Sequence, residues 1–177
     1  GAVSNNWNDA QNWAGAVVPG ASSNVSILVS QFNPEVTKNA LSNNLVVNSG
    51  SSLTIHPEAV INVNGSLSVK GSGRFLLKNT ADKKSALFLN GDATGTIQSE
   101  YQVLKGKKNL VSSPVEMAYS KTFLNMFLRT YDETIGQWGS YIVPTNDPLH
   151  VMQGYEVYSL SSEVRTFEGT PDQEPKS

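Results

Sequence analysis

The stretch "LVVNSGSSLTI" (Leu45–Ile55) is followed, after a short interval, by the similar stretch "LSVKGSGRFLL" (Leu67–Leu77). Each stretch has two short apolar runs on either side of a polar corner that is rich in Gly and Ser. When the two are superimposed, apolar residues coincide at four positions: Leu45 with Leu67, Val47 with Val69, Leu53 with Phe75, and Ile55 with Leu77. We therefore interpret the 22-residue spacing as a structural repeat.

A third apolar piece extends this repeat. The sequence "INVNG" (Ile61–Gly65) matches "LFLNG" (Leu87–Gly91) at a slightly longer spacing, and the additional residues fit into the charged stretch Lys78–Lys84. Such a stretch is typical of a loop that projects from a corner into solvent. Three short alternating strands per circuit of about 22 residues predict a parallel β-helix, in which successive coils stack through parallel ladders. The predicted fold class is therefore all-β.

An antiparallel meander is the competing interpretation, because the Asn64-Gly65 step is typical of a tight hairpin. A two-residue loop there would pair Val63 with Ser66, which sets an apolar face against hydroxyl groups. A three-residue loop would pair Val63 with Leu67 but would leave Gly65 outside the left-handed position that requires it. The hairpin is thus the less favoured alternative. Because two coils are fewer than the roughly three that such repeats need, the flanking segments are expected to cap them.

The amino-terminal flank has the features of such a cap. It contains Trp7, Trp13, a turn at Pro19-Gly20, and an alternating strand at Val25–Val29. Two tryptophan rings over the open end of a solenoid would contribute on the order of 2 kcal/mol each by burial. The alternative is a carbohydrate platform formed by the two rings, but tryptophan is more often buried.

The pattern changes beyond Thr96, where the 22-residue repeat is predicted to stop. The remaining segments indicate an antiparallel β-sandwich-like part with one short helix over Tyr119–Leu128 and a hairpin over Tyr131–Tyr141. The predicted organisation is a capped β-helix-like part at residues 1–97 and a β-rich part at residues 98–177, unless the two form one continuous unit. The polar end of the chain, from Gly169 onward, is expected to fray.

Composition excludes several classes of function. The chain has 177 residues, 13 Lys and Arg against 15 Asp and Glu, and no cysteine. The only local basic group is Lys105, Lys107 and Lys108, so no nucleic-acid footprint is predicted. His56 and His150 have no neighbouring ligand residues in the sequence, and we predict neither a metal site nor a cofactor. The apolar runs are too short for membrane insertion.

A catalytic constellation is not evident either. No G-x-S-x-G elbow occurs, and Glu58 is the only acid between Leu45 and Leu77. We therefore predict that the protein is not an enzyme. The weakest alternative is a polysaccharide-degrading enzyme that uses Asp132, Glu133 and Asp147, although their spacing matches no calcium or catalytic motif.

Taken with the later strings "LVSSPV" and "QGYEVYSL", the opening "WNDAQNWAGAVVPG" resembles a module of large secreted and outer-surface multidomain proteins of Bacteroidetes bacteria. The resemblance covers nearly the whole chain. It implies a short run of parallel β-helix coils followed by a β-rich section, often upstream of a carboxy-terminal sorting domain. It also implies a secreted or cell-surface location, and it supplies no catalytic residues.

Together these observations predict a non-catalytic extracellular structural or adhesion module whose partner is a glycan or a cell-surface protein. The alternative, from another functional class, is a carbohydrate-binding module. In that case Trp138, Tyr141 and Tyr155 are the candidate ligand-binding residues, because their rings would stack on sugar faces. The accessibility of these rings distinguishes the two hypotheses.

Overall fold

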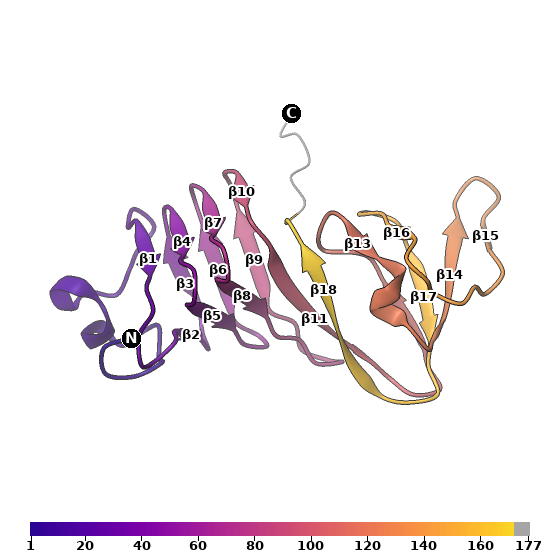
Figure 1. The fold of residues 1–177 in the computed structure, drawn as a ribbon, viewed down its shortest axis with the longest axis horizontal. Coiled ribbons are helices and arrows are strands. Elements are labelled where there is room, and N and C mark those ends of the chain that lie inside the picture. The colour runs from indigo at the N-terminus through magenta and orange to yellow at the C-terminus, as the bar shows by residue number, and fades with distance from the viewer. Residues whose placement is uncertain (172–177) are drawn as a thin grey trace.

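The computed structural model of the protein describes residues 1–171. Figure 1 shows a row of stacked strands at the amino-terminal end, followed by antiparallel sheets at the opposite end of the molecule. The described part of the chain is thus an all-β solenoid of about 3 turns joined to antiparallel sheets. The tail expected to fray falls mostly on residues 172–177, which lie outside the described residues.

Three parallel sheets form the solenoid, and each coil contributes one strand to each sheet. The first coil comprises β1 (Val25–Ile27), β2 (Glu35–Val36) and β3 (Ala40–Ser42); the second comprises β4 (Leu45–Val47), β5 (Ser52–Ile55) and β6 (Val60–Val63); the third comprises β7 (Leu67–Val69), β8 (Arg74–Leu77) and β9 (Ala86–Leu89). After these coils come β10 (Ala93–Thr94), which pairs with β7, and β11 (Ile97–Val103), which pairs with β8.

The predicted register between the second and third coils is confirmed. Every apolar pair expected from the repeat occurs: Leu45 with Leu67, Val47 with Val69, Leu53 with Phe75, Ile55 with Leu77, Ile61 with Leu87, and Val63 with Leu89. Most of these side chains are fully buried, because parallel stacking places each apolar residue directly on another. The hairpin alternative is wrong, since β6 and β7 lie in different sheets and Asn64-Gly65 forms a corner between them.

These corners are held by their own ladder of hydrogen bonds. The side chain of Asn44 donates to Oδ1 of Asn24 at 2.9 Å and accepts from the backbone N–H of Ser66 at 2.8 Å. The N–H of Gly91 donates to the carbonyl of Gly65 at 3.0 Å, and a Cβ on Gly91 would lie only 2.4 Å from that oxygen. The repeated Asn-Gly step therefore arises from close stacking of corners rather than from hairpin turns.

Replacing Asn44 by alanine tests this ladder. We expect Asn44→Ala to lower the free energy of unfolding by about 1 kcal/mol, because the N–H and the hydroxyl of Ser66 lose their acceptor. Urea denaturation measures the change. Asn43→Ala is the matched control, since the Asn43 side chain makes a single hydrogen bond, to Asn24 at 3.1 Å. Equal losses in both variants would contradict a specific role for Asn44.

The cap packs as the sequence suggested. Trp7 is completely buried, the two tryptophan rings meet edge to face with centroids 4.7 Å apart, and Nε1 of Trp13 donates to the carbonyl of Trp7 at 2.7 Å. The backbone beside Trp7 pairs with Glu35 of β2, so the cap closes the free edge of that sheet. Without exposed surface Trp7 has no face for a sugar, and the carbohydrate-platform alternative for this pair is wrong.

The first coil differs from the sequence-based interpretation. Val25–Ile27 is not part of the cap but pairs with β4 as a solenoid strand. The offsets between the first and second coils are shorter than those between the second and third, as the pairs Val25 with Leu45 and Glu35 with Thr54 show. A search of the sequence for one fixed repeat length does not detect a coil whose corners differ in length from those of the other coils.

The repeat also extends beyond Thr96. Ile97 pairs with Phe75, at the same offset that relates Phe75 to Leu53, so the prediction that the pattern stops at this point is wrong. The other edge of β11 pairs antiparallel with β18 (Glu163–Gly169) along its whole length. The boundary expected between residues 97 and 98 therefore falls inside a strand that belongs to both parts.

An antiparallel sheet of four strands forms the far end of the molecule. Its order is β12 (Lys108–Val111), β17 (Tyr155–Tyr158), β14 (Phe127–Asp132) and β15 (Gln137–Trp138), and beside it β13 (Ala118–Tyr119) pairs with β16 (Pro148–Leu149). The predicted hairpin is confirmed by the pairing of Tyr131 with Trp138. One face of the four-stranded sheet, with Leu128 and Val157, is buried in the core.

The helix expected over Tyr119–Leu128 is not confirmed. Only a 3-10 turn, η3 (Ser120–Phe123), forms there, and it buries Phe123 against Phe167 of β18. Asn125 then takes a positive φ of 66°, and β14 begins at Phe127. Pairing of Leu128 with Val157 in the sheet outweighs the helical spacing of the apolar residues.

Candidate functional site

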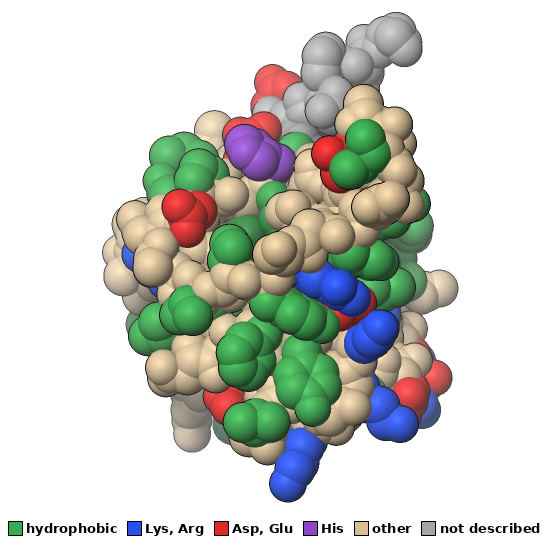
Figure 2. Space-filling model, turned by 90° about the vertical axis from the view of Figure 1, so that its right-hand side faces the viewer, with side chains coloured by type: hydrophobic (Ala, Val, Ile, Leu, Met, Phe, Trp, Pro, Cys, Tyr) green, Lys and Arg blue, Asp and Glu red, His purple; other side chains and the backbone are tan. Residues whose placement is uncertain are grey.

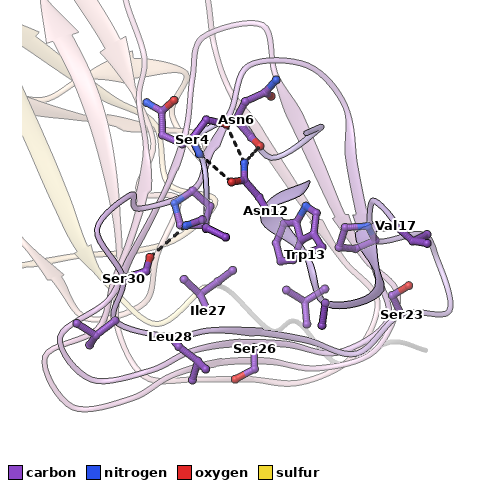
Figure 3. A pocket seen from close by; sticks show the side chains of 18 of the residues that line it. Ser4, Asn6, Asn12, Trp13, Val17, Ser23, Ser26, Ile27, Leu28 and Ser30 are labelled. Atoms are coloured by element: carbon purple, nitrogen blue, oxygen red, sulfur yellow. Dashed lines mark hydrogen bonds between the residues drawn. The ribbon is translucent and has the colours of Figure 1, made fainter. Parts of the chain in front are cut away.

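A groove of about 800 Å³ lies between the amino-terminal cap and β1. In Figure 3, Asn12 is turned toward Ser4 and Asn6, while Trp13 and Ile27 border the open space. Oδ1 of Asn12 accepts from the N–H of Ser4 at 2.9 Å, and its Nδ2 donates to the carbonyl of Asn6 at 2.8 Å. These hydrogen bonds of Asn12 hold the cap together, so we assign the polar residues of the groove a structural role.

The second candidate surface is the outer face of the four-stranded sheet. Side chains alternate between the two faces of a strand, so the residues between the buried ones share the outer face. We call this surface the aromatic face; it comprises Lys108, Leu110, Phe127, Arg129, Tyr131, Trp138, Glu156 and Tyr158 from the strands and Tyr141 from the following loop. Figure 2 looks at this end of the molecule and shows hydrophobic side chains gathered with basic ones among them.

A buried ion pair lies at the centre of the aromatic face. Nε and Nη2 of Arg129 donate to the two carboxylate oxygens of Glu156 at 3.0 and 2.9 Å. Glu156 is only 2% exposed, and its Oε1 also accepts from the hydroxyl of Tyr141. Both carboxylate oxygens are therefore occupied by neighbours within the protein.

This geometry sets the protonation states of the cluster. Burial alone would raise the pKa of Glu156, but the hydrogen bonds from Arg129 and Tyr141 outweigh it and hold the pKa below its usual value. The same hydrogen bond to Glu156, together with burial, raises the pKa of Tyr141. At neutral pH the carboxylate is thus charged and the phenol remains a donor. A phenol held in this way is a poor nucleophile.

Aromatic rings enclose the guanidinium group of Arg129. Its Cζ lies 5.1 Å from the ring centroid of Trp138 and 4.6 Å from that of Tyr141, which is within cation–π range. Tyr131 packs edge to face on Trp138 at 5.1 Å, and Phe127 packs similarly on Tyr141 at 6.1 Å. The rings therefore support one another, and the face is preorganised.

A small pocket opens on the aromatic face where β17 begins. Its volume is about 390 Å³, and its walls are Leu110, Val111, Tyr131, Trp138, Gly154 and Tyr155. A Cβ placed on Gly154 would meet no atom within 4 Å, so the space beside this lining residue is open. The lining is almost entirely apolar, and its size suits one large side chain or one sugar ring.

The structure separates the three predicted binding residues. Trp138 and Tyr141 come together on either side of Arg129, and Tyr141 is 42% exposed. Tyr155 is 3% exposed, and its hydroxyl accepts from the N–H of His150 at 2.8 Å. It therefore supports the wall of the pocket and offers no free ring face for stacking.

Sequence reasoning missed Arg129 and Glu156, which organise the site. They lie 27 residues apart and meet only because β14 pairs with β17 in this register. The available signal was a single charged residue in each of two aromatic-rich strand segments, "FLRTY" and "YEVY", of which only the first has aromatic residues two positions before and after the charge. Opposite charges at the centres of two such strands are typical of a cross-strand pair.

A protein family model matches nearly the whole chain. The family model described as "Domain of unknown function (DUF8693)" matches residues 1–173. The chain belongs to this family. No curated protein and no solved structure matches it. The function of this DUF8693 chain is therefore inferred from its own capped solenoid and aromatic face.

The acidic side chains of residues 1–171 do not gather in clusters of three or more with one another or with histidine. Across residues 1–171, no three His, Asp or Glu side chains gather closely enough to hold a metal ion. Asp147 is engaged locally with Thr145 and Ser120, and Asp132 caps its own turn through Thr134, whose hydrogen bonds lower the pKa of that carboxyl. Nor does the described part contain a helix of the length and apolarity needed to span a membrane.

Proposed function

We propose that the protein is a non-catalytic extracellular structural or adhesion module of a bacterial surface or secreted protein, and that it binds its partner through the aromatic face. The observation that carries the proposal is a partly exposed cluster of Trp, Tyr and Phe rings organised by a buried Arg129–Glu156 pair. Trp, Tyr and Arg dominate the energetic centres of protein interfaces. A ring cluster ordered before binding loses little conformational freedom when a partner arrives.

The rest of the molecule supports a scaffold role. Its solenoid core is closed by Trp7 and stacks apolar side chains coil upon coil, which makes a stiff support for the sheet at the far end. Of the acids that were candidates for polysaccharide cleavage, Asp132, Glu133 and Asp147, the first and last are engaged locally by Thr134 and Thr145. The resemblance of the opening "WNDAQNWAGAVVPG" to secreted modules supports the extracellular location.

Glycan binding is the second candidate function. It is favoured by the partial exposure of Trp138 and Tyr141 on one surface, which leaves ring area available for the C–H faces of a sugar. It is disfavoured by the burial of the Glu156 carboxylate, which is only 2% exposed and is therefore out of reach of sugar hydroxyls.

One binding experiment distinguishes these functions. The purified chain would be screened against a phage library of random 12-residue peptides and against a glycan and polysaccharide array. We expect peptide binding, and we expect Trp138→Ala to weaken it at least about tenfold, because this ring walls the pocket. Phe88→Ala removes a 59% exposed aromatic ring from the solenoid and should leave binding unchanged.

The outcomes separate clearly. Glycan signals that disappear in Trp138→Ala would establish the second candidate function in place of the first. Binding that survives Trp138→Ala, or that falls equally in Phe88→Ala, would show that the aromatic face is not the binding site. Far-UV circular dichroism of each variant verifies that the fold is retained.

A further inference from the structure

The aromatic face has an uncompensated basic rim. Lys105, Lys107 and Lys108 are all exposed in or beside the turn that leads into β12, and none forms an ion pair with any residue in the described part of the chain. Lys108 is on the same face of the sheet as Glu156, because it lies two residues along β12 from Leu110, the residue opposite Glu156. Lys108 is also opposite Tyr158 in the sheet, and Tyr158 is opposite Phe127.

The neighbouring acids do not neutralise this rim. Glu156 is bound by Arg129, and Glu163, which lies near the turn, is paired with Arg165 at 2.7 Å. Lys108 lies beside the Phe127 end of β14, because both residues flank Tyr158 in the sheet, whereas Asp132 lies at the other end of β14. The free charge at this edge of the face is therefore positive, and a complementary partner must be acidic.

The rim and the apolar pocket have a fixed spacing. Lys108 and Leu110 are two residues apart on β12, while Phe127 and Tyr131 are four residues apart on β14. At about 3.4 Å per residue, Lys108 lies about 7 Å along β12 from Leu110 in the pocket wall. An extended peptide crosses that distance in about two residues.

We infer that the aromatic face docks an acidic, extended protein segment, which inserts one large apolar side chain into the pocket and places carboxylates against Lys105, Lys107 and Lys108. This inference rests on the proposed adhesion function and adds the chemistry of the partner. An acidic glycan fits less well. The rings meet at 63° and 68° and form a corrugated surface rather than a flat platform, and the Glu156 carboxylate is buried away from sugar hydroxyls.

The peptide selection described above tests the inference when it is combined with charge reversal. Peptides enriched on the wild-type chain should carry more Asp and Glu than the unselected library, together with a Trp, Phe or Leu. The strongest binder would be synthesised in its selected form and with every acid replaced by its amide. We expect the triple variant Lys105→Glu/Lys107→Glu/Lys108→Glu to weaken the acidic peptide at least about tenfold, and the amide peptide to bind weakly to both proteins.

A second triple variant controls for net charge. Reversing Lys38, Lys70 and Lys78, which lie on the solenoid, changes the total charge by the same amount and should leave binding unchanged. Added salt should weaken the wild-type complex and have little effect on the complex of the rim variant. Measurement by isothermal titration calorimetry gives the affinities.

Three results would overturn the inference. They are enriched peptides without acids, equal losses in the two triple variants, and binding of polygalacturonate, but no peptide, through the rim. Peptides that depend on Trp138 but not on the rim would refute the acidic partner and leave the adhesion function standing. Peptides whose binding requires neither Trp138 nor the rim lysines would refute both the acidic partner and the proposed binding through the aromatic face.

Discussion

Gly95→Ala is expected to destabilise the protein by about 4 kcal/mol, the upper range for a single substitution. Gly95 lies in the corner between β10 and β11, where its φ is +84°. A Cβ at this position would sit 2.0 Å from the carbonyl oxygen of Val69 in the coil below. Two costs add, because the left-handed backbone disfavours a side chain and the stacked coils would have to move apart.

Gly106→Ala is the matched control for this prediction. Gly106 also has a positive φ, of 65°, but a Cβ there would meet no atom within 4 Å. Its cost is therefore the backbone term alone, about 1 kcal/mol. Guanidinium denaturation of both variants measures the difference, and equal destabilisation would show that close stacking at Gly95 contributes nothing.

The second large effect is expected from the ion pair of the aromatic face. Arg129→Met should lower the midpoint of thermal unfolding by roughly 10 °C at pH 7, because it leaves the Glu156 carboxylate buried without its cation. Lys83→Met breaks the exposed pair between Lys83 and Glu58, in which both side chains are more than half exposed, and should shift the midpoint by no more than about 2 °C.

The pH dependence of Arg129→Met has a definite sign. In the wild-type protein the lowered pKa of Glu156 means that the pair stabilises the fold above the unfolded-state pKa, and this stability is lost as the pH falls through the folded value. In the variant, burial is opposed by the hydrogen bond from Tyr141 but no longer by Arg129, and the pKa of Glu156 should rise relative to the wild type. Protonation then relieves the buried charge, so the difference between variant and wild type should narrow as the pH falls toward about 4.

A double variant identifies the cause of the loss. Adding Glu156→Leu to Arg129→Met removes the stranded carboxylate and should recover most of the stability, as replacement of buried ion pairs by apolar residues often does. If the double variant is as unstable as Arg129→Met, the loss comes from packing of the arginine rather than from the unpaired charge. Differential scanning calorimetry across the pH range provides both measurements.

These predictions rest on features that differ in how far sequence could reveal them. The register of β4–β9 was predictable because the second and third coils have equal spacing over two of their three strands, so apolar residues superimpose at one offset. The first coil was hidden by unequal corners, although its strands pair in the same way. A constant offset in the sequence identifies regular coils, whereas an irregular coil such as the first is identified by the burial of its strand residues in the structure.

The site was only partly predictable for a related reason. Tyr155 and Tyr158 are three residues apart on β17, so they project to opposite faces of the sheet, and a shift of one residue in strand register exchanges them. The sequence does not show which of the two is exposed. Arg129 and Glu156 are joined by the antiparallel pairing of distant strands, and no local pattern brings them together.

Because the coils stack in parallel, the length of the molecule depends on how many coils it has. Neighbouring strands in a sheet are about 4.8 Å apart, so each inserted coil would carry the far end outward by one such step and turn it slightly through the sheet twist. Because β11 continues from the solenoid into its pairing with β18, the antiparallel sheets would move as a unit with the last coil. The number of coils would therefore set the distance between the amino-terminal cap and the aromatic face, without any change in the face itself.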